Sequence, residues 1–302
     1  MGERSPCLFC IGMAGTGKTS LVQRLNSELL SHDKVPYLVN LDPAVLELPY
    51  EPNIDIRDNL DYKVVMEKYG LGPNGAIMTS LNLFATKFDQ VLDVLQERCE
   101  QVDNIIIDTP GQIEVFNWSA SGSIILDTIS ALMPSAILYV VDTEKCCQNI
   151  AAFMSNMLYA CSILFKTQLP LIVVFNKTDL CSAEEPIKWL RDYFYFQEAV
   201  FAEESKGSNV PYHLSLVQSM GLVLEEFYRN MEVVSVSSHT GEGFDDLRDA
   251  IKKAIDGGMA EFEERSKKYN QKVSNPPQED KDKKEDLARL LNDLALDKQK
   301  DK

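Results

Sequence analysis

A glycine-rich segment near the start of the chain has the residue types and spacing of a phosphate-binding loop. Gly12 is followed, after four residues, by Gly17-Lys18-Thr19, and the segment stands between a short apolar run and an amphipathic one. Glycines let successive backbone N–H groups turn toward one ligand, and the start of a helix adds positive dipole. Lys18 would reach the outer phosphates, and the Thr19 hydroxyl would coordinate Mg²⁺. The nucleotide-binding residues expected here are Gly12, Gly15, Thr16, Gly17, Lys18, Thr19 and Ser20.

A second cluster follows the apolar run 104–107. Asp108 ends this predicted strand, at the edge where open α/β sheets bind ligands, and we expect it to join Thr19 at the metal. Gly111 would bring a backbone N–H close to the γ-phosphate, and Gln112 is placed to orient an attacking water. A Pro-Gly pair is also common in ordinary turns, but its position downstream of a phosphate loop favours the functional interpretation.

The residues Asn176-Lys177-Thr178-Asp179 follow an apolar run and have the N-K-x-D pattern of guanine-specific proteins. The Asp179 carboxylate can accept two hydrogen bonds from guanine N1–H and the exocyclic amine, whereas adenine has an acceptor at N1 and no amine at C2. Each unmade bond would cost about 1–3 kcal/mol, so we expect GTP to be preferred over ATP by at least about tenfold. The Lys177 stem should cover the base while its charge stays in solvent.

A looser match follows the last apolar run, 233–236. Ser237 and Ser238 open a Ser-Ser-His-Thr-Gly-Glu-Gly segment similar to the loop whose backbone contacts guanine O6 in other GTPases. The same segment could cap the turn that opens the final helix, and the two roles are compatible. We therefore place both serines in the guanine site.

The elements that must position these motifs can be read from alternating apolar and amphipathic runs. This alternation predicts strand-helix-strand units, and hence an α/β P-loop NTPase fold with a mostly parallel central sheet flanked by helices. The predicted strands are 7–11, 37–41, 104–107, 136–141, 171–175 and 233–236. The predicted helices are 18–31, 56–69, 80–100, 150–165, 184–204, 212–229 and 243–256. The helix around 153–161 is apolar enough either to line the core or to form a groove for an apolar partner segment.

The composition changes near Gly257-Gly258, after which Lys, Glu and Asp dominate and a Pro-Pro pair interrupts the chain. We expect a nucleotide-binding domain over 1–256 and a charged, partly helical and partly disordered tail over 257–302. Leucines in the tail have the uneven spacing of a nuclear export signal, although an amphipathic helix explains them equally well. They are Leu287, Leu291, Leu294 and Leu296.

The overall composition excludes several classes of partner. The 302 residues carry a formal net charge of −16, which argues against direct nucleic-acid binding because phosphates need a basic face. Seven cysteines, an odd number, favour a reducing intracellular setting. Core packing explains Cys7 and Cys10 on the first strand better than a metal site does. No run approaches about 18 uninterrupted apolar residues, so neither a membrane span nor a membrane partner is expected.

Two further motifs narrow the resemblance to one family: Gly72-Pro73-Asn74, and Asn40-Leu41-Asp42-Pro43-Ala44 after the second predicted strand. With the motifs above, they make residues 7–256 resemble the GPN-loop GTPases. The runs 54–58 and 118–122 are similar to the eukaryotic first paralogue of that family, which is linked to RNA polymerase II assembly and nuclear import. The resemblance implies a cytoplasmic protein that shuttles to the nucleus and contacts RNA polymerase II subunits.

The same resemblance implies a homodimer, or a heterodimer with a paralogous GPN-loop GTPase, in which the nucleotides lie near the interface. Each Gly-Pro-Asn loop would enter the partner's active site, where Asn74 could stabilise charge in the transition state; a surface turn is the alternative. Asp42, Gln112 and Glu114 would surround the attacking water alongside Asp108. Capping of the next turn is the alternative for Asp42, and a solvated carboxylate is the alternative for Glu114.

The predicted reaction is in-line attack of water on the γ-phosphate of GTP, with Mg²⁺ held by Thr19 and Asp108. A GTP-dependent scaffold or chaperone that does not hydrolyse GTP is the alternative, but it should lack the water-orienting groups Asp42 and Gln112. A metal-delivery GTPase should carry His or Cys clusters, whereas the three histidines are well apart in sequence. We therefore predict a GTP hydrolase that acts as an assembly switch.

Overall fold

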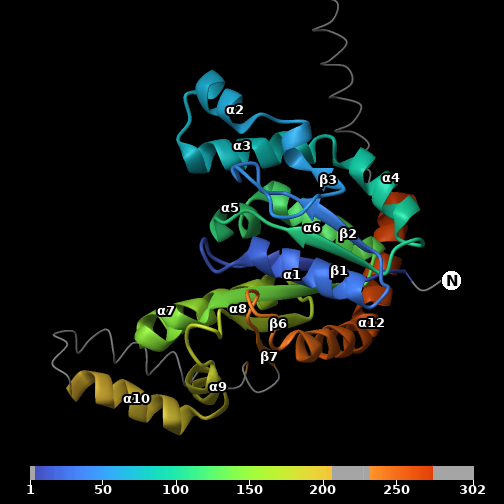
Figure 1. Ribbon diagram of the computed structural model, residues 1–302. Coiled ribbons are helices and arrows are strands. Elements are labelled where there is room, and N and C mark those ends of the chain that lie inside the picture. Colours follow the sequence, from blue (N-terminus) through green and yellow to red (C-terminus); the bar gives the residue numbers. More distant parts are fainter. Residues whose placement is uncertain (1–3, 206–226, 228–230, 275–302) are drawn as a thin grey trace, which may run out of the picture. The chain divides into compact units, whose positions relative to one another are not determined.

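The computed structural model describes residues 4–205, 227 and 231–274 of the chain. Among these residues, seven strands form one sheet in the order β3-β2-β4-β1-β5-β6-β7, and every pair is parallel (Figure 1). The strands are β1 Cys7–Ile11, β2 Pro36–Asn40, β3 Ile54–Asp55, β4 Asn104–Asp108, β5 Ser135–Asp142, β6 Leu171–Asn176 and β7 Glu232–Ser235. The predicted α/β fold with a parallel central sheet is confirmed.

Helices connect the strands and cover both faces of the sheet. They are α1 Lys18–Ser31, the 3-10 helix η1 Ile56–Asp58, α2 Tyr62–Tyr69, α3 Pro73–Ala85, α4 Phe88–Arg98, α5 Ile113–Asn117, α6 Ala120–Leu132, α7 Thr143–Gln148, α8 Ile150–Thr167, α9 Glu184–Arg191, α10 Tyr193–Ser205 and α12 Phe244–Ser274. The short strand β3 and the helices α5, α6 and α7 have no counterpart in the sequence prediction. The predicted helix 212–229 and the tail leucines lie outside the described residues.

Three predicted helices are in fact interrupted, and a polar cap explains two of the breaks. The predicted helix 56–69 becomes η1 and α2, because the Asp61 carboxylate accepts from the first backbone N–H groups of α2. The predicted helix 184–204 divides at Asp192, whose carboxylate accepts from Phe194 and Tyr195 at the start of α10. The predicted helix 80–100 is replaced by α3 and α4, and α3 begins earlier, at Pro73.

Alternate residues of each strand face opposite sides of the sheet, so the core has two clusters. On one face Leu8 and Cys10 join a cluster with Leu21 of α1 and Leu247 of α12. On the other face Cys7 belongs to the larger cluster that includes α3, α4, α6 and α8. Cys7 and Cys10 therefore lie on opposite faces, each as a buried free thiol in the core.

Helix α8 carries the apolar run for which the sequence left core and groove open. Phe153, Met154, Met157, Ala160 and Cys161 are all buried in the larger core cluster, so core packing accounts for this face. Among the described helices, α8 is the one long and apolar enough to cross a membrane by length and composition, with a mean hydropathy of 1.3. Core helices of other proteins meet the same criteria, and 39% of this helix is buried.

Helix α12 continues through Gly257 and Gly258, where the composition changes. The chain divides into two compact units, Met1–Met259 and Ala260–Lys302. In the second unit the structure describes residues 260–274 as the end of this helix, with i,i+4 ion pairs from Lys267 to Glu263 and from Lys268 to Glu264.

The parallel register brings the polar motifs to one edge of the sheet. Asn40 of β2 lies opposite Asp108 of β4, and Asp142 of β5 lies opposite Asn176 of β6. These residues end their strands, at the carboxyl edge where open α/β sheets bind ligands. The phosphate loop follows β1, which lies between β4 and β5 in the sheet, so the two pairs flank it.

Candidate active site

The segment between β1 and α1 has the backbone of a phosphate-binding loop. Gly15 and Gly17 have φ values of 80° and 88°, a conformation that other residues rarely adopt. A Cβ atom on Gly12 would stand 2.4 Å from the Val140 carbonyl oxygen, so this position has no room for a side chain. The glycines expected from the motif are therefore required by backbone conformation or by close approach.

Lys18 is buried at the start of α1. Its Nζ donates to the Gly12 carbonyl at 2.8 Å and to the Met13 carbonyl at 3.1 Å, which holds the ammonium over the phosphate loop. Burial lowers the pKa of Lys18, and the nearby carboxylates of Asp108 and Asp42 oppose that change. The ammonium thus contacts the phosphate loop and is close enough to feel the charge of the two carboxylates expected to act in the reaction.

Asp108 is almost fully buried, and its two carboxylate oxygens have different surroundings among the described residues. Oδ2 accepts a 2.9 Å hydrogen bond from the Tyr50 hydroxyl, whereas Oδ1 has no hydrogen-bond partner in the part of the chain that the structure describes. Burial raises the pKa of Asp108 to about 6, although the Thr19 hydroxyl, the Tyr50 hydroxyl and the Lys18 charge each lower it. An unpartnered carboxylate oxygen beside a threonine hydroxyl suits a hard divalent cation.

No three His, Cys, Asp or Glu side chains gather as a metal site among the described residues. A magnesium ion at Thr19 and Asp108 would therefore take its other ligands from phosphate oxygens and water, as Mg²⁺ at phosphate sites usually does. The residues present fit Mg²⁺ on those terms.

Asp42 makes the capping contact considered for it and a second contact that the sequence did not predict. Its Oδ1 accepts from the Ala44 backbone N–H at 2.9 Å, which is the capping role, and its Oδ2 accepts from the Gly111 N–H at 3.3 Å. The Gly111 N–H, which we expected to approach the γ-phosphate, is thus engaged by Asp42. A Cβ on Gly111 would stand 3.5 Å from the Ala14 Cβ, so this turn lies against the phosphate loop.

Gln112 and Asn74 are in direct contact within one chain. Gln112 Nε2 donates to Asn74 Oδ1 at 2.5 Å, and Gln112 Oε1 is buried with no hydrogen-bond partner among the described residues. Gly72 is the N-cap of α3, and Pro73 and Asn74 form its first turn, so the motif opens a helix. Asn74 therefore reaches the predicted water-orienting residue without a second subunit.

Glu114 has a different setting from the other predicted catalytic residues. It lies in the first turn of α5 and is exposed. Its Oε1 accepts from the Tyr159 hydroxyl of α8 at 3.4 Å. The alternative of an exposed carboxylate thus describes Glu114 as the structure places it.

The guanine motif borders a pocket of 460 Å³. Its lining residues are Gly17, Ser20, Gln23, Arg24, Ser27, Asn176, Lys177, Asp179, Leu180, Ser238 and His239. Asp179 Oδ1 accepts a 2.6 Å hydrogen bond from the Ser237 hydroxyl, and that bond lowers the pKa of Asp179. The carboxylate is therefore held ionised, in the form that accepts guanine N1–H and the exocyclic amine.

Asn176 connects three loops of the site: the guanine motif to which it belongs, the phosphate loop, and the loop of Ser237 and Ser238. Its Nδ2 donates to the Thr16 carbonyl at 3.0 Å, and its Oδ1 accepts from the Ser238 backbone N–H at 3.1 Å and from the Ser238 hydroxyl at 2.8 Å. The side chain is buried, so these bonds are shielded from water. The Ser238 N–H is thus bonded to Asn176, and the Asn176 side chain joins the phosphate loop to the loop of Ser237 and Ser238.

The Lys177 ammonium has two hydrogen-bond partners that the sequence did not predict. Its stem lines the pocket, but its Nζ donates to the Gly15 carbonyl at 2.7 Å and to Asp142 Oδ2 at 2.8 Å. The ammonium is thus held by the phosphate loop and a carboxylate, while the Lys177 side chain remains 31% exposed. The bond to Gly15 also fixes the guanine motif against the phosphate loop.

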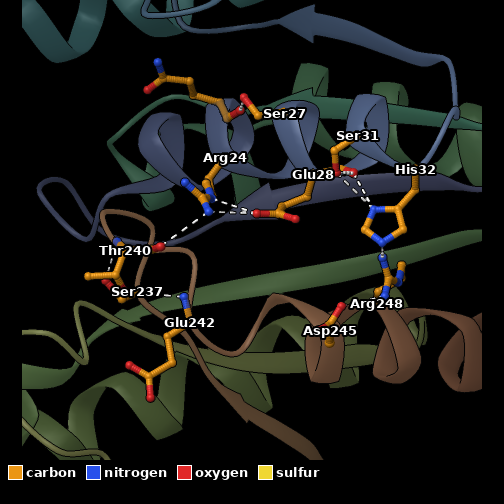
Figure 2. Close-up of polar contacts among 11 residues, drawn as sticks. Arg24, Ser27, Glu28, Ser31, His32, Ser237, Thr240, Glu242, Asp245 and Arg248 are labelled. Carbon is orange, nitrogen blue, oxygen red and sulfur yellow. Dashed lines mark hydrogen bonds and ion pairs between the residues drawn. The ribbon is translucent and has the colours of Figure 1, made fainter.

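Figure 2 shows how α1 is braced against the loop that follows β7. The Arg24 guanidinium pairs with Glu28 at 2.8 Å and donates to the Thr240 carbonyl at 3.3 Å. A Cβ on Gly241 would stand 1.8 Å from Arg24 Nη2, so this glycine leaves room for the guanidinium. Directly after α1, a ring nitrogen of His32 lies 2.7 Å from the Arg248 guanidinium of α12. The helix that carries the phosphate loop therefore also supports the loop of Ser237 and Ser238.

Sequence reasoning missed three residues that support the site: Tyr50, Asp142 and Arg24. A signal existed for Asp142, because an Asp-Thr pair stands at the end of the apolar strand β5 just as Asp108 and Thr109 stand at the end of β4. Tyr50 lies in an irregular segment between β2 and β3, where no periodicity points to it. Arg24 is a polar residue on an amphipathic helix, and only the fold brings it to Thr240.

Comparisons with known proteins agree on the family. Residues 10–257 match the family described as "Conserved hypothetical ATP binding protein". The chain is 50% identical over 305 residues to GPN-loop GTPase 1 of Schizosaccharomyces pombe, and the matched region covers 99% of this chain and 82% of that protein. It is 50% identical over 295 residues to GPN-loop GTPase 1 of Saccharomyces cerevisiae, which covers 96% of this chain and 75% of that protein.

The fold leads to the same family. It is similar to the crystal structure of a GTPase from Pyrococcus abyssi in apo form, with a TM-score of 0.72, 29% identity, and coverage of 84% of this chain and 98% of that one. The family description mentions ATP, but the ionised Asp179 in the base pocket matches the donors of guanine and not the acceptor of adenine. The chain is a GTP hydrolase and belongs to the GPN-loop GTPases.

Proposed function

We propose that this GTPase is a nucleotide-controlled assembly factor that helps RNA polymerase II subunits to assemble and to enter the nucleus. The resemblance of the runs 54–58 and 118–122 to the eukaryotic first paralogue supports the choice of client. The 2.5 Å contact between Gln112 and Asn74 supports the proposed switch, because it connects the N-terminus of α3 to the residue expected at the γ-phosphate. A change of the bound nucleotide would then alter the contacts at the start of α3.

The proposed chemistry is attack of water on the γ-phosphate, promoted by positioning and charge. Gln112 would orient the water, and Asp42 would hold the Gly111 turn beside it through the 3.3 Å hydrogen bond. Lys18 and the glycine-rich backbone would stabilise the charge that develops on the phosphate oxygens. Mg²⁺ would be held by Thr19 and Asp108 and would supply positive charge at those oxygens.

The family-specific run 54–58 has a role in this arrangement. Asp55 forms a 2.6 Å ion pair with Arg57 and accepts from Asn40 Nδ2 at 3.0 Å. Arg57 Nη1 also donates to the carbonyls of Val45 and Leu46, each at 3.2 Å. This part of the run therefore braces the segment that carries Asp42, which supports a connection between the run and the site.

The chain is further proposed to pair with a second copy or with a paralogous GPN-loop GTPase. The exposed position of Gly72 to Asn74 at the start of α3 supports an interface there. Light scattering of the purified protein with GDP, and with a non-hydrolysable GTP analogue, should give the mass of a dimer in at least one state. A single-chain mass in both states, alone and mixed with a paralogue, would refute this part.

Affinity capture from cells tests the client. Tagged Gln112→Ala protein should hold GTP for longer, whereas tagged Lys18→Ala protein should bind little nucleotide. RNA polymerase II subunits should be enriched with one of these variants over the other, measured against wild-type protein. Equal capture would remove the switch, and equal capture with no phosphate release by the wild type would favour the non-hydrolysing scaffold.

We place the protein in the cytoplasm with passage through the nucleus, on the basis of the leucine spacing in the tail. Substituting Leu294 and Leu296 together should trap a tagged protein in the nucleus if these leucines are read as an export signal. An unchanged distribution would remove the export signal without affecting the enzymatic assignment.

A further inference from the structure

We propose that Tyr50 is a positioning residue for the magnesium site: its hydroxyl holds Asp108 Oδ2, which leaves Oδ1 to serve the metal. This inference rests on the proposed magnesium site at Thr19 and Asp108. Tyr50 belongs to none of the motifs named in the sequence, and only the fold brings it to Asp108, 58 residues away.

The contact between the two side chains is short and buried. The Tyr50 hydroxyl donates to Asp108 Oδ2 at 2.9 Å, and the two residues are 7% and 1% exposed. A hydrogen bond to a charged group is worth about 1.5–3 kcal/mol, and water cannot easily replace it at this depth. The bond therefore selects one orientation of the carboxylate.

The two oxygens of Asp108 are not equivalent as a result. Oδ2 has a donor, whereas Oδ1 has no hydrogen-bond partner among the described residues although it is buried. Burying a carboxylate oxygen without a hydrogen-bond partner costs free energy. A ligand that binds to Oδ1 therefore recovers part of that free energy. A metal ion, or a water bound to it, is the ligand expected beside Thr19.

A tyrosine suits this task because its hydroxyl is placed by the packing of its ring. The Tyr50 ring belongs to the core cluster on the face of α1, with Leu48 packed against the same cluster. Only two side-chain dihedrals set the hydroxyl position, and a buried ring restricts both. The donor is thus held in place before any metal arrives.

The segment that carries Tyr50 is itself fixed at both ends. The Leu41 N–H donates to the Asp108 carbonyl at 2.9 Å, and the Asn53 N–H donates to the Leu38 carbonyl at 2.8 Å. Asp42 lies on this same segment. One segment therefore contacts Asp108 through Tyr50 and the Gly111 turn through Asp42, so it sets the metal carboxylate and the γ-phosphate turn together.

Tyr50→Phe tests the proposal, because it keeps the ring and removes only the hydroxyl. The readout is the affinity for the fluorescent nucleotide methylanthraniloyl-GDP, titrated against Mg²⁺. The Mg²⁺ concentration that gives half of the tight binding should rise about tenfold, the usual size of a loss in supporting hydrogen bonds around a metal. Affinity in EDTA should stay within about twofold of the wild type, since Tyr50 is not among the residues that line the guanine pocket.

Two controls separate positioning from packing. Tyr139→Phe removes another buried phenol hydroxyl, one that donates to Asn156 at 3.5 Å, and should leave the Mg²⁺ dependence unchanged. In an Asp108→Asn background, adding Tyr50→Phe should cause no further change in Mg²⁺ dependence, because Tyr50 acts through Asp108. Thermal unfolding of each variant checks that the fold is retained.

The outcomes separate this inference from the site on which it rests. If wild-type protein binds the probe equally with Mg²⁺ and with EDTA, the magnesium site is wrong, and the role of Tyr50 falls with it. If wild type depends on Mg²⁺ and Tyr50→Phe has the same dependence, only the role of Tyr50 is overturned. An undiminished effect of Tyr50→Phe in the Asp108→Asn background would also overturn it.

Discussion

Lys177 forms a 2.8 Å ion pair with Asp142, which joins the loops at the ends of the neighbouring strands β6 and β5. The Asp142 side chain is 5% exposed, so the lysine is its main source of compensating charge. Lys145 approaches the same carboxylate at 3.7 Å but is itself largely exposed. Asp142 lies outside the guanine motif, and its ion pair with Lys177 holds that motif in place.

Asp142→Asn should weaken nucleotide binding. The substitution removes the negative charge that holds Lys177 and leaves the ammonium with neutral carbonyl acceptors only. Breaking one member of a partly buried charge pair costs at least about 1.4 kcal/mol, so we expect GDP affinity to fall by about tenfold or more. Titration calorimetry measures this directly.

The matched control is Asp245→Asn, which makes the same chemical change in an ion pair with Arg248 where the carboxylate is 86% exposed. Exposed pairs contribute little, so GDP affinity should stay unchanged. Equal effects of Asp142→Asn and Asp245→Asn would mean that Asp142 has no special role at the site.

A second prediction concerns two glycines of the nucleotide domain. Gly12→Ala would place a Cβ 2.4 Å from the Val140 carbonyl oxygen, a backbone atom that cannot move aside, and should lower the free energy of unfolding by about 1–3 kcal/mol. In Gly75→Ala, inside α3, the added Cβ would lie 3.5 Å from Leu71, an ordinary contact, and the free energy of unfolding should rise by about 0.5–1 kcal/mol. Urea denaturation compares the two, and a Gly12→Ala protein as stable as the wild type would contradict the close approach.

The motifs that depend on local backbone could be predicted from the sequence. The phosphate loop and the guanine motif each follow a strand directly, and their function depends on a few consecutive residues whose spacing carries the information. The parallel sheet also followed from the alternation of runs, because strands buried on both faces are continuously apolar. Gly12 to Thr19 and Asn176 to Asp179 therefore lie where the sequence placed them.

Contacts between distant segments could not be predicted in this way. Tyr50 and Asp108 are 58 residues apart, and Gln112 and Asn74 are 38 apart, so neither pair has a common local pattern. Periodicity also misplaced the start of α3, because Pro73 looked like part of a loop although proline suits the first turn of a helix. The helix break at Asp192 depends on a side-chain cap, which weighs little beside the apolar pattern around it.

A third prediction concerns pH and the nucleotide-free, metal-free protein. Burial raises the pKa of Asp108 from an ordinary value of 3.8 to about 6, so between these values the folded protein binds more protons than the unfolded chain. Folding stability should therefore fall as pH rises from about 4 to about 6. The contribution of Asp108 is about 2 pH units at 1.4 kcal/mol each, on the order of 3 kcal/mol.

Asp108→Asn isolates this contribution, since the amide does not titrate. In EDTA the stability of Asp108→Asn relative to wild type should increase as pH rises through that window and level off above it. Chemical denaturation at a series of pH values gives the difference. A difference that stays constant from pH 4 to pH 7 would mean that Asp108 titrates normally in the fold.

The last prediction concerns how Asn74 acts. Asn74→Ala removes the acceptor that holds Gln112 Nε2 at 2.5 Å, so phosphate release should slow by about tenfold while GDP affinity stays similar. Mixing Asn74→Ala chains with Lys18→Ala chains then separates the two possible settings. If Asn74 worked across a dimer, random pairing would restore about a quarter of wild-type activity, because half of the dimers would hold one intact site. The contact within a single chain predicts no recovery above the separate variants, and recovery near a quarter would instead place Asn74 in the partner's active site.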